Sequence, residues 1–255
     1  MCVKFLYPDF ENECRSKLLR EAKLHVFQSC ALRVRSIINK LPFAVDHNNE
    51  ELINTMNLED CGLRVVSVAY SQNEDGDQGP NSNTIACASY VNGNGEMEEF
   101  IGLRYLNLKL HKDHNSGNYS VPNGFMSAQK EEKIEDLEKF EEFLLDKRPN
   151  LMVLSGENKD ALLILEDLKM VLKKLEQKSP QLANIPIEIL DMEMPKLFKQ
   201  SKVCEVEFGT NIPNIVKESI AMARYVQDPM LCLSQLCNQD RDILGKFFSY
   251  FLNNV

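Results

Sequence analysis

The run Leu63-Arg64-Val65-Val66-Ser67-Val68-Ala69-Tyr70 marks the point at which the sequence changes from helical to strand character. It is short, apolar almost throughout and rich in valine, a pattern typical of a strand that is buried on both faces of a sheet. We expect two further strands over residues 84–91 and 96–103. Between them, Asn92-Gly93-Asn94-Gly95 supplies residues that tolerate the positive φ angles of a tight hairpin. These three strands can therefore form an antiparallel meander.

Helical and strand patterns alternate after this meander. Apolar side chains recur at helical spacing from Lys130 to Pro149 and again from Asp160 to Leu175, and strand-like runs follow at 151–154 and 187–190. Because these later strands return through crossover helices, we expect them to lie parallel to the first strand. The order predicts an α/β fold, with a mixed five-stranded sheet flanked by helices in the ribonuclease H-like arrangement.

Helical segments precede and follow this sheet. Residues 9–41 have apolar side chains at helical spacing, and Asp9 is placed to cap the first turn. We expect an N-terminal helical arm over residues 1–60, a ribonuclease H-like domain over residues 61–209, and C-terminal helices over residues 210–255 that complete the domain. The polar stretch 107–129 is expected to be an insertion, and whether it orders on a partner stays open.

The charge is uneven along the chain. The net charge is −9, yet residues 1–45 carry eight Lys or Arg against four Asp or Glu. A mainly acidic surface repels a phosphate backbone, so we expect weak or no autonomous nucleic-acid binding and a preference for basic partners. No run is apolar enough to cross a membrane, and no secretory signal is recognisable at the N-terminus. The eight scattered cysteines are expected to be free, as in an intracellular protein.

Several stretches are similar, in the same order, to one known family: Phe5–Glu11 with Leu18–Lys23, Gly62–Ser71, Leu154–Ala161 with Ile164–Asp167, and Lys217–Pro229 with Asp242–Leu244. Together they resemble the central YqgF, ribonuclease H-like domain, with its preceding helix, of the eukaryotic transcription elongation factor and histone chaperone called suppressor of Ty six (Tex-like family). The longest match is Lys217–Pro229. Colinearity over nearly the whole chain makes the resemblance specific.

The resemblance implies a non-catalytic scaffold or interaction domain. The implied partners are the RNA polymerase II elongation complex and histones H3–H4 or nucleosomes, and the implied location is the nucleus. Functions of that family's flanking helix-hairpin-helix, S1-like and tandem SH2 modules are not carried over to this sequence. A short paralogue, a fragment and a degenerate copy all remain open, as do the oligomeric state and the partner-binding surface.

Ribonuclease H-like nucleases hold two divalent ions with carboxylates from the first strand, the fourth strand and a late helix. The resemblance places Ala69 where related domains have the first-strand aspartate, and alanine cannot bind a metal ion. Glu157 follows the fourth strand, and Asp191 and Glu193 follow the fifth. We expect these acids to be vestigial, with no metal, no cofactor and no catalysis.

Two enzyme-like alternatives stay open. One is a metal-dependent nuclease or resolvase-like enzyme that uses the residual acids Glu157, Asp191 and Glu193. The other is an RNA-processing role like that of stand-alone YqgF proteins, which requires the missing first-strand aspartate. Separately, Arg33, Arg35 and Lys40 are candidate contacts to nucleic acid or to an acidic partner, although a solvated helix face is the more common explanation of such residues.

Overall fold

The computed structural model describes residues 3–43, 62–71, 86–106, 126–179 and 185–237. Within these residues one sheet contains five strands in the order β3-β2-β1-β4-β5. The strands are β1 Val65–Tyr70, β2 Ala86–Val91, β3 Met97–Gly102, β4 Leu151–Ser155 and β5 Ile187–Leu190. The first three are antiparallel, whereas β4 and β5 run parallel to β1. The predicted mixed sheet is confirmed, and β5 has the predicted bounds.

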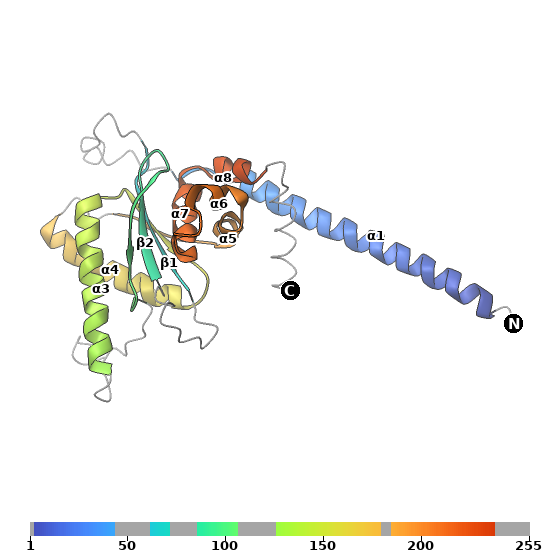
Figure 1. The fold of residues 1–255 in the computed structure, drawn as a ribbon, viewed down its shortest axis with the longest axis horizontal. Helices are drawn as coiled ribbons and strands as arrows, with labels where there is room; N and C mark the ends of the chain where they lie inside the picture. The colour runs from blue at the N-terminus through green and yellow to red at the C-terminus, as the bar shows by residue number, and fades with distance from the viewer. Residues whose placement is uncertain (1–2, 44–61, 72–85, 107–125, 180–184, 238–255) are drawn as a thin grey trace.

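β1 is the central strand, and every residue in it is buried. Val68 lies opposite Ala88 of β2 and Leu154 of β4. Val66 and Tyr70 face two helices, α3 Met126–Lys147 and α4 Asp160–Lys178, which cover one side of the sheet (Figure 1). Because side chains alternate along a strand, the intervening residues face the other side. The sheet is therefore covered on both faces, as the continuous apolar run of β1 predicts.

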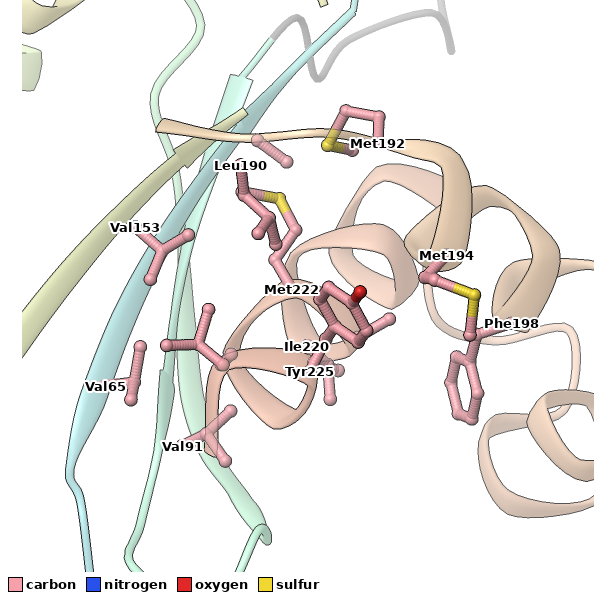
Figure 2. Close-up of a cluster of buried hydrophobic side chains, with 14 of the residues drawn as sticks. Val65, Val91, Val153, Leu190, Met192, Met194, Phe198, Ile220, Met222 and Tyr225 are labelled. Carbon is pink, nitrogen blue, oxygen red and sulfur yellow. The ribbon is translucent and has the colours of Figure 1, made fainter. Parts of the chain in front are cut away.

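The opposite face is covered by the C-terminal helices. They are α5 Glu193–Lys199, α6 Lys202–Phe208, α7 Asn214–Gln227 and α8 Pro229–Leu236. In Figure 2, Val65, Val91 and Val153 of the sheet point toward Ile220 and Met222 of α7. Burial of such large apolar side chains stabilises the fold by about 1.5–3 kcal/mol each. α7 is therefore the helix that holds the second layer on the sheet.

The first helix, α1 Val3–Ile38, projects away from the rest of the fold (Figure 1). At 1.5 Å per residue it is about 54 Å long. Only its last turns pack on the core, through Cys30, Val34 and the buried Ile37. Among the α1 side chains that the structure describes, several large apolar ones are exposed: Tyr7, Phe10, Leu18, Leu19, Leu24, Phe27 and Leu32.

Two predicted helix starts are wrong. α1 begins at Val3 and not after Asp9, because Pro8 removes only one N–H donor and the helix continues upstream of it. α3 begins at Met126, so the last four residues of the expected insertion 107–129 belong to a helix. The polar residues that precede them resemble a loop, although Met, Ala and Gln are themselves good helix formers. Residues 107–125 of this insertion, the expected loop 73–83 and the end of the C-terminal segment, 238–255, lie outside the described residues.

The helix expected after Met194 is two helices. α5 ends at Lys199, and the hydroxyl of Ser201 accepts a hydrogen bond of 3.1 Å from the N–H of Cys204 to cap α6. This serine separates the two helices, because its extended backbone cannot continue α5. The predicted helix after Asp228-Pro229 is confirmed, with Asp228 accepting a 2.8 Å bond from the N–H of Leu231.

Candidate functional site

The parallel strands β1, β4 and β5 end at the same edge of the sheet, where α/β proteins commonly place their sites. Ala69, Glu157, Asp191 and Glu193 lie at or just after these strand ends. The structure therefore brings all the candidate residues of the vestigial cluster to one edge. The hydroxyl of Tyr70 donates a 2.9 Å hydrogen bond to Asn158 Oδ1 and ties the end of β1 to the loop after β4.

Ala69 occupies a dry position in the core. It has 0% exposure, lies opposite Cys87 of β2, and belongs to the apolar cluster that packs against α7. Burial is also the main cause that raises the pKa of the Cys87 thiol to about 12. Such a setting disfavours charge, and a divalent ion prefers several oxygen ligands. The place that the family resemblance assigns to a first-strand carboxylate is therefore occupied by packed methyl and thiol groups.

Glu157, in the loop after β4, is neutralised by a lysine of α5. Its Oε1 forms an ion pair with Nζ of Lys196. Both side chains are only partly exposed, so solvent screens the pair less than it screens a pair on an open surface. The carboxylate that a nuclease would use at this strand end is held by a cation of the chain itself.

Asp191 and Glu193 share a guanidinium from the arm. Nη2 of Arg33 donates a 2.8 Å hydrogen bond to Asp191 Oδ2, and Nε donates one of 2.5 Å to Glu193 Oε2. The Glu193 side chain is 8% exposed, and its hydrogen bond to Arg33 is the main cause that raises the pKa of that guanidinium. Asp191 Oδ1 also accepts a 3.0 Å bond from the N–H of Glu193. The arm thus supplies a permanent cation to the only buried acid that the sequence singled out.

Sequence reasoning missed Glu218, a further carboxylate on the late helix α7. Its side chain is 11% exposed and forms an ion pair with Nζ of Lys199 on α5. Its charge contributes to raising the pKa of the Cys87 thiol, which places it near the strand that pairs with Ala69. The signal was available, because ribonuclease H-like sites include an acid on a late helix and Glu218 lies in the longest matching stretch.

A buried set of three hydroxyls was also missed. Ser67 of β1 donates a 2.6 Å hydrogen bond to the backbone oxygen of Ser219 on α7. The hydroxyls of Ser89 on β2 and Ser219 are hydrogen-bonded to each other. All three residues are buried, and together they join two strands to α7. We read this set as a structural contact between the layers, because it satisfies polar groups that burial would otherwise leave unpaired.

These residues do not fit the pair of divalent ions that the fold family implies. Ala69 offers no oxygen, and each carboxylate described above is paired with Lys196, Lys199 or Arg33. Across the residues that the structure describes, no three His, Cys, Asp or Glu side chains lie close enough together to hold a metal ion. No metal-dependent step follows from this geometry.

Comparison with known protein families shows to which family this chain belongs. The model of the YqgF family, described as Holliday-junction resolvase-like of SPT6, matches residues 59–237. The chain belongs to this family.

Curated relatives agree with this assignment to the YqgF family. Transcription elongation factor SPT6 of Drosophila melanogaster is 30% identical over 245 residues, which cover 94% of this chain and 12% of that protein. Transcription elongation factor SPT6-like of Arabidopsis thaliana is 21% identical over 247 residues, covering 94% of the chain and 16% of the relative. Suppressor of Ty 6 homolog of Caenorhabditis elegans is 21% identical over 241 residues, which cover 94% of this chain and 14% of that protein. The chain therefore spans less than a fifth of each of these relatives.

The three basic residues singled out in the sequence have different surroundings in this YqgF domain. Arg33 is engaged with Asp191 and Glu193, and Nζ of Lys40 lies 4.8 Å from the centre of the Tyr225 ring. Arg35 is exposed on α1. A role for these residues in contacting nucleic acid or an acidic partner stays a prediction. None of the described helices is long and apolar enough to span a membrane.

Proposed function

We propose that this YqgF domain is a non-catalytic scaffold that serves transcription elongation by RNA polymerase II on chromatin in the nucleus. The observation that carries the proposal is the set of contacts at the ends of β1, β4 and β5. Ala69, at the place that the family resemblance assigns to the first-strand carboxylate, is fully buried, and Lys196, Lys199 and Arg33 pair with the acids described above. A surface that holds its own cations in place of metal ions suits binding better than phosphodiester cleavage.

The relatives support the direction of this proposal. Those from Drosophila melanogaster and Arabidopsis thaliana are named transcription elongation factors. Because the chain matches only part of each relative, its own partners have to be tested directly. We propose histones H3–H4, nucleosomes and the elongation complex as these partners.

The charge distribution favours basic partners. The net charge is −9, and exposed glutamates recur along one face of α3 at positions 131, 135, 138 and 142. Spacings of three and four residues place these carboxylates on one side of the helix. An acidic stripe attracts basic proteins and repels free nucleic acid. We therefore propose weak binding to DNA alone and stronger binding to histones.

A binding experiment with purified components tests the proposal. The chain is immobilised and offered RNA polymerase II elongation complexes, H3–H4 and free duplex DNA in separate reactions, each over a salt series. We expect retention of histones or elongation complexes at physiological salt and little retention of DNA. The double variant Glu131→Lys, Glu135→Lys is expected to weaken histone binding about tenfold or more, and Glu131→Gln, Glu135→Gln to weaken it less. A folded protein that retains neither partner would overturn the proposal.

A further inference from the structure

The arm is fastened to the domain by charge on one side of its last turns. Arg33 reaches Asp191 and Glu193, which follow β5, and Lys40 lies over the ring of Tyr225. Cys30, Val34 and the buried Ile37 pack beneath these groups, so apolar and ionic contacts together hold the end of α1. Any new charge in this place changes the balance that holds the arm.

Ser36 lies at this junction. It is exposed and lines a cavity of about 140 Å³ together with Arg33, Lys40, Asp191 and Glu193. Its hydroxyl donates a 2.7 Å hydrogen bond to the backbone oxygen of Arg33, so it lies above the turn that carries the guanidinium. The spacing of three residues to Arg33 places these two side chains on one face of α1, and Lys40, just after the helix ends, lines the same cavity.

The sequence around Ser36 has the charge pattern that basophilic serine/threonine kinases select. In Arg33-Val34-Arg35-Ser36 the basic residues occupy the third and first positions before the hydroxyl. α1 ends at Ile38, two residues after Ser36. Helix ends open more readily than helix interiors, so a kinase can take up this turn in extended form.

We propose that Ser36 is a phosphorylation site whose modification releases the arm from the domain. A kinase that selects arginine three residues before the acceptor supplies ATP as the phosphoryl donor. The Ser36 hydroxyl oxygen bonds to the γ-phosphorus, the bond from that phosphorus to the β–γ bridging oxygen breaks, ADP leaves and the hydroxyl proton is released. This inference is independent of which partner the domain binds.

Three electrostatic effects of the phosphate act in the same direction. The group carries about −1.5 to −2 charges, so it attracts Arg33 and Lys40 away from their present partners. It also repels Asp191 and Glu193, which face the same cavity. Finally, negative charge in the last turn of a helix opposes the helix dipole. The phosphate therefore both replaces and repels the acids that hold α1.

The experiment uses the full chain and a purified basophilic kinase with ATP. Mass spectrometry locates the phosphate, and hydrogen exchange of residues 30–38 and 191–199 measures release of the arm. Ser36→Ala removes the acceptor and Ser36→Glu adds charge without the kinase. Ser29→Glu is the matched control, because Ser29 is exposed on the same helix and bonds His25 in a similar way, 2.9 Å from its backbone oxygen.

We expect phosphate on Ser36 and none on Ser29, with exchange in the two segments about tenfold faster after modification or in Ser36→Glu. The acceleration shrinks in high salt, because screening weakens both the attraction and the repulsion. Absence of phosphate on Ser36 while the kinase modifies a control peptide with the same residues would overturn the inference. Unchanged exchange in both the phosphorylated chain and Ser36→Glu would also overturn it.

Discussion

Arg33, on the arm, and Asp191, at the end of β5, are 158 residues apart in the sequence and are joined by a 2.8 Å hydrogen bond. The same guanidinium binds Glu193. A cation from outside the sheet domain thus lies among acids that, in a nuclease of this fold, would be free to hold metal ions. This relationship gives the arm a structural role and gives both acids a cation of the chain itself as their partner.

Replacing Arg33 tests this role of the arm. In Arg33→Ala, Glu193 stays nearly buried without its cation, and we expect the free energy of unfolding to fall by about 1–2 kcal/mol. Urea unfolding followed by circular dichroism measures the change. Arg35→Ala is the control and should change stability by less than about 0.5 kcal/mol, because Arg35 is exposed. Equal effects of the two variants would contradict a stabilising contact of Arg33 with Asp191 and Glu193.

Restoring the first-strand carboxylate tests whether Ala69 belongs to the core. An aspartate at this position would be buried among apolar groups without a cation to pair with its carboxylate. Ala69→Asp should therefore lower the free energy of unfolding by about 3–5 kcal/mol. The loss should diminish as pH falls and the carboxyl group takes up a proton. Ala69→Asn, of nearly equal size, separates the cost of charge from that of volume. A stable Ala69→Asp protein whose melting temperature rises with Mg²⁺ would contradict our account of the site.

We expect the buried thiol of Cys87 to lower the stability of the protein at alkaline pH. Its pKa is raised to about 12 by burial, from a reference of 9.0 in the unfolded chain. Between these values the unfolded chain loses a proton that the folded chain keeps, so the free energy of unfolding falls as pH rises. One such group contributes at most about 1.4 kcal/mol per pH unit. Unfolding midpoints in urea at pH 9, 10 and 11 should fall less steeply for Cys87→Ala than for the wild type, and equal slopes would exclude Cys87 as a source.

Gly93 is a test of the hairpin between β2 and β3. A Cβ atom on Gly93 would lie 2.5 Å from the Cα of Gly62, a backbone atom that cannot move aside easily. We expect Gly93→Ala to cost about 2 kcal/mol or more in stability. Gly95→Ala should cost less, about 1 kcal/mol, because a Cβ there would meet only Gln227 Oε1, at an ordinary contact distance of 3.7 Å, and the main cost is the positive φ of 82°. Thermal unfolding of both variants measures the two losses of stability. A larger loss for Gly95→Ala than for Gly93→Ala would show that the backbone at Gly93 can move to make room for a methyl group.

Local patterns made the sheet predictable. The valines of β1 favour a strand, and the glycines between β2 and β3 favour a tight turn. Each of these signals lies within a few consecutive residues, so it can be recognised in the sequence alone. The start of α1 was misplaced because Pro8 and Asp9 resemble a helix boundary. A proline followed by an aspartate favours a helix start, but it does not show whether the residues before it are also helical.

The pairing of charges was not predictable in the same way. Glu157, Asp191 and Glu193 were found from their positions after strands, but their cations come from elements that only the fold brings near. Lys199 and Glu218 are likewise on separate helices, α5 and α7. The sequence position of an acid indicates which strand end or helix carries it. Its cationic partner depends on how the helices pack against one another, and the sequence pattern does not determine the angles between helices.

We propose that Glu157, Asp191 and Glu193 neither hold metal ions nor cleave nucleic acid. The most direct measurement incubates the wild-type chain and Glu157→Ala with four-way DNA junctions and duplexes, over a Mg²⁺ and Mn²⁺ series, and separates the products on a denaturing gel. We predict no cleavage above the protein-free reaction for either protein at any metal concentration. Cleavage that rises with metal concentration in the wild type and is lost in Glu157→Ala would contradict the claim and establish the domain as a nuclease.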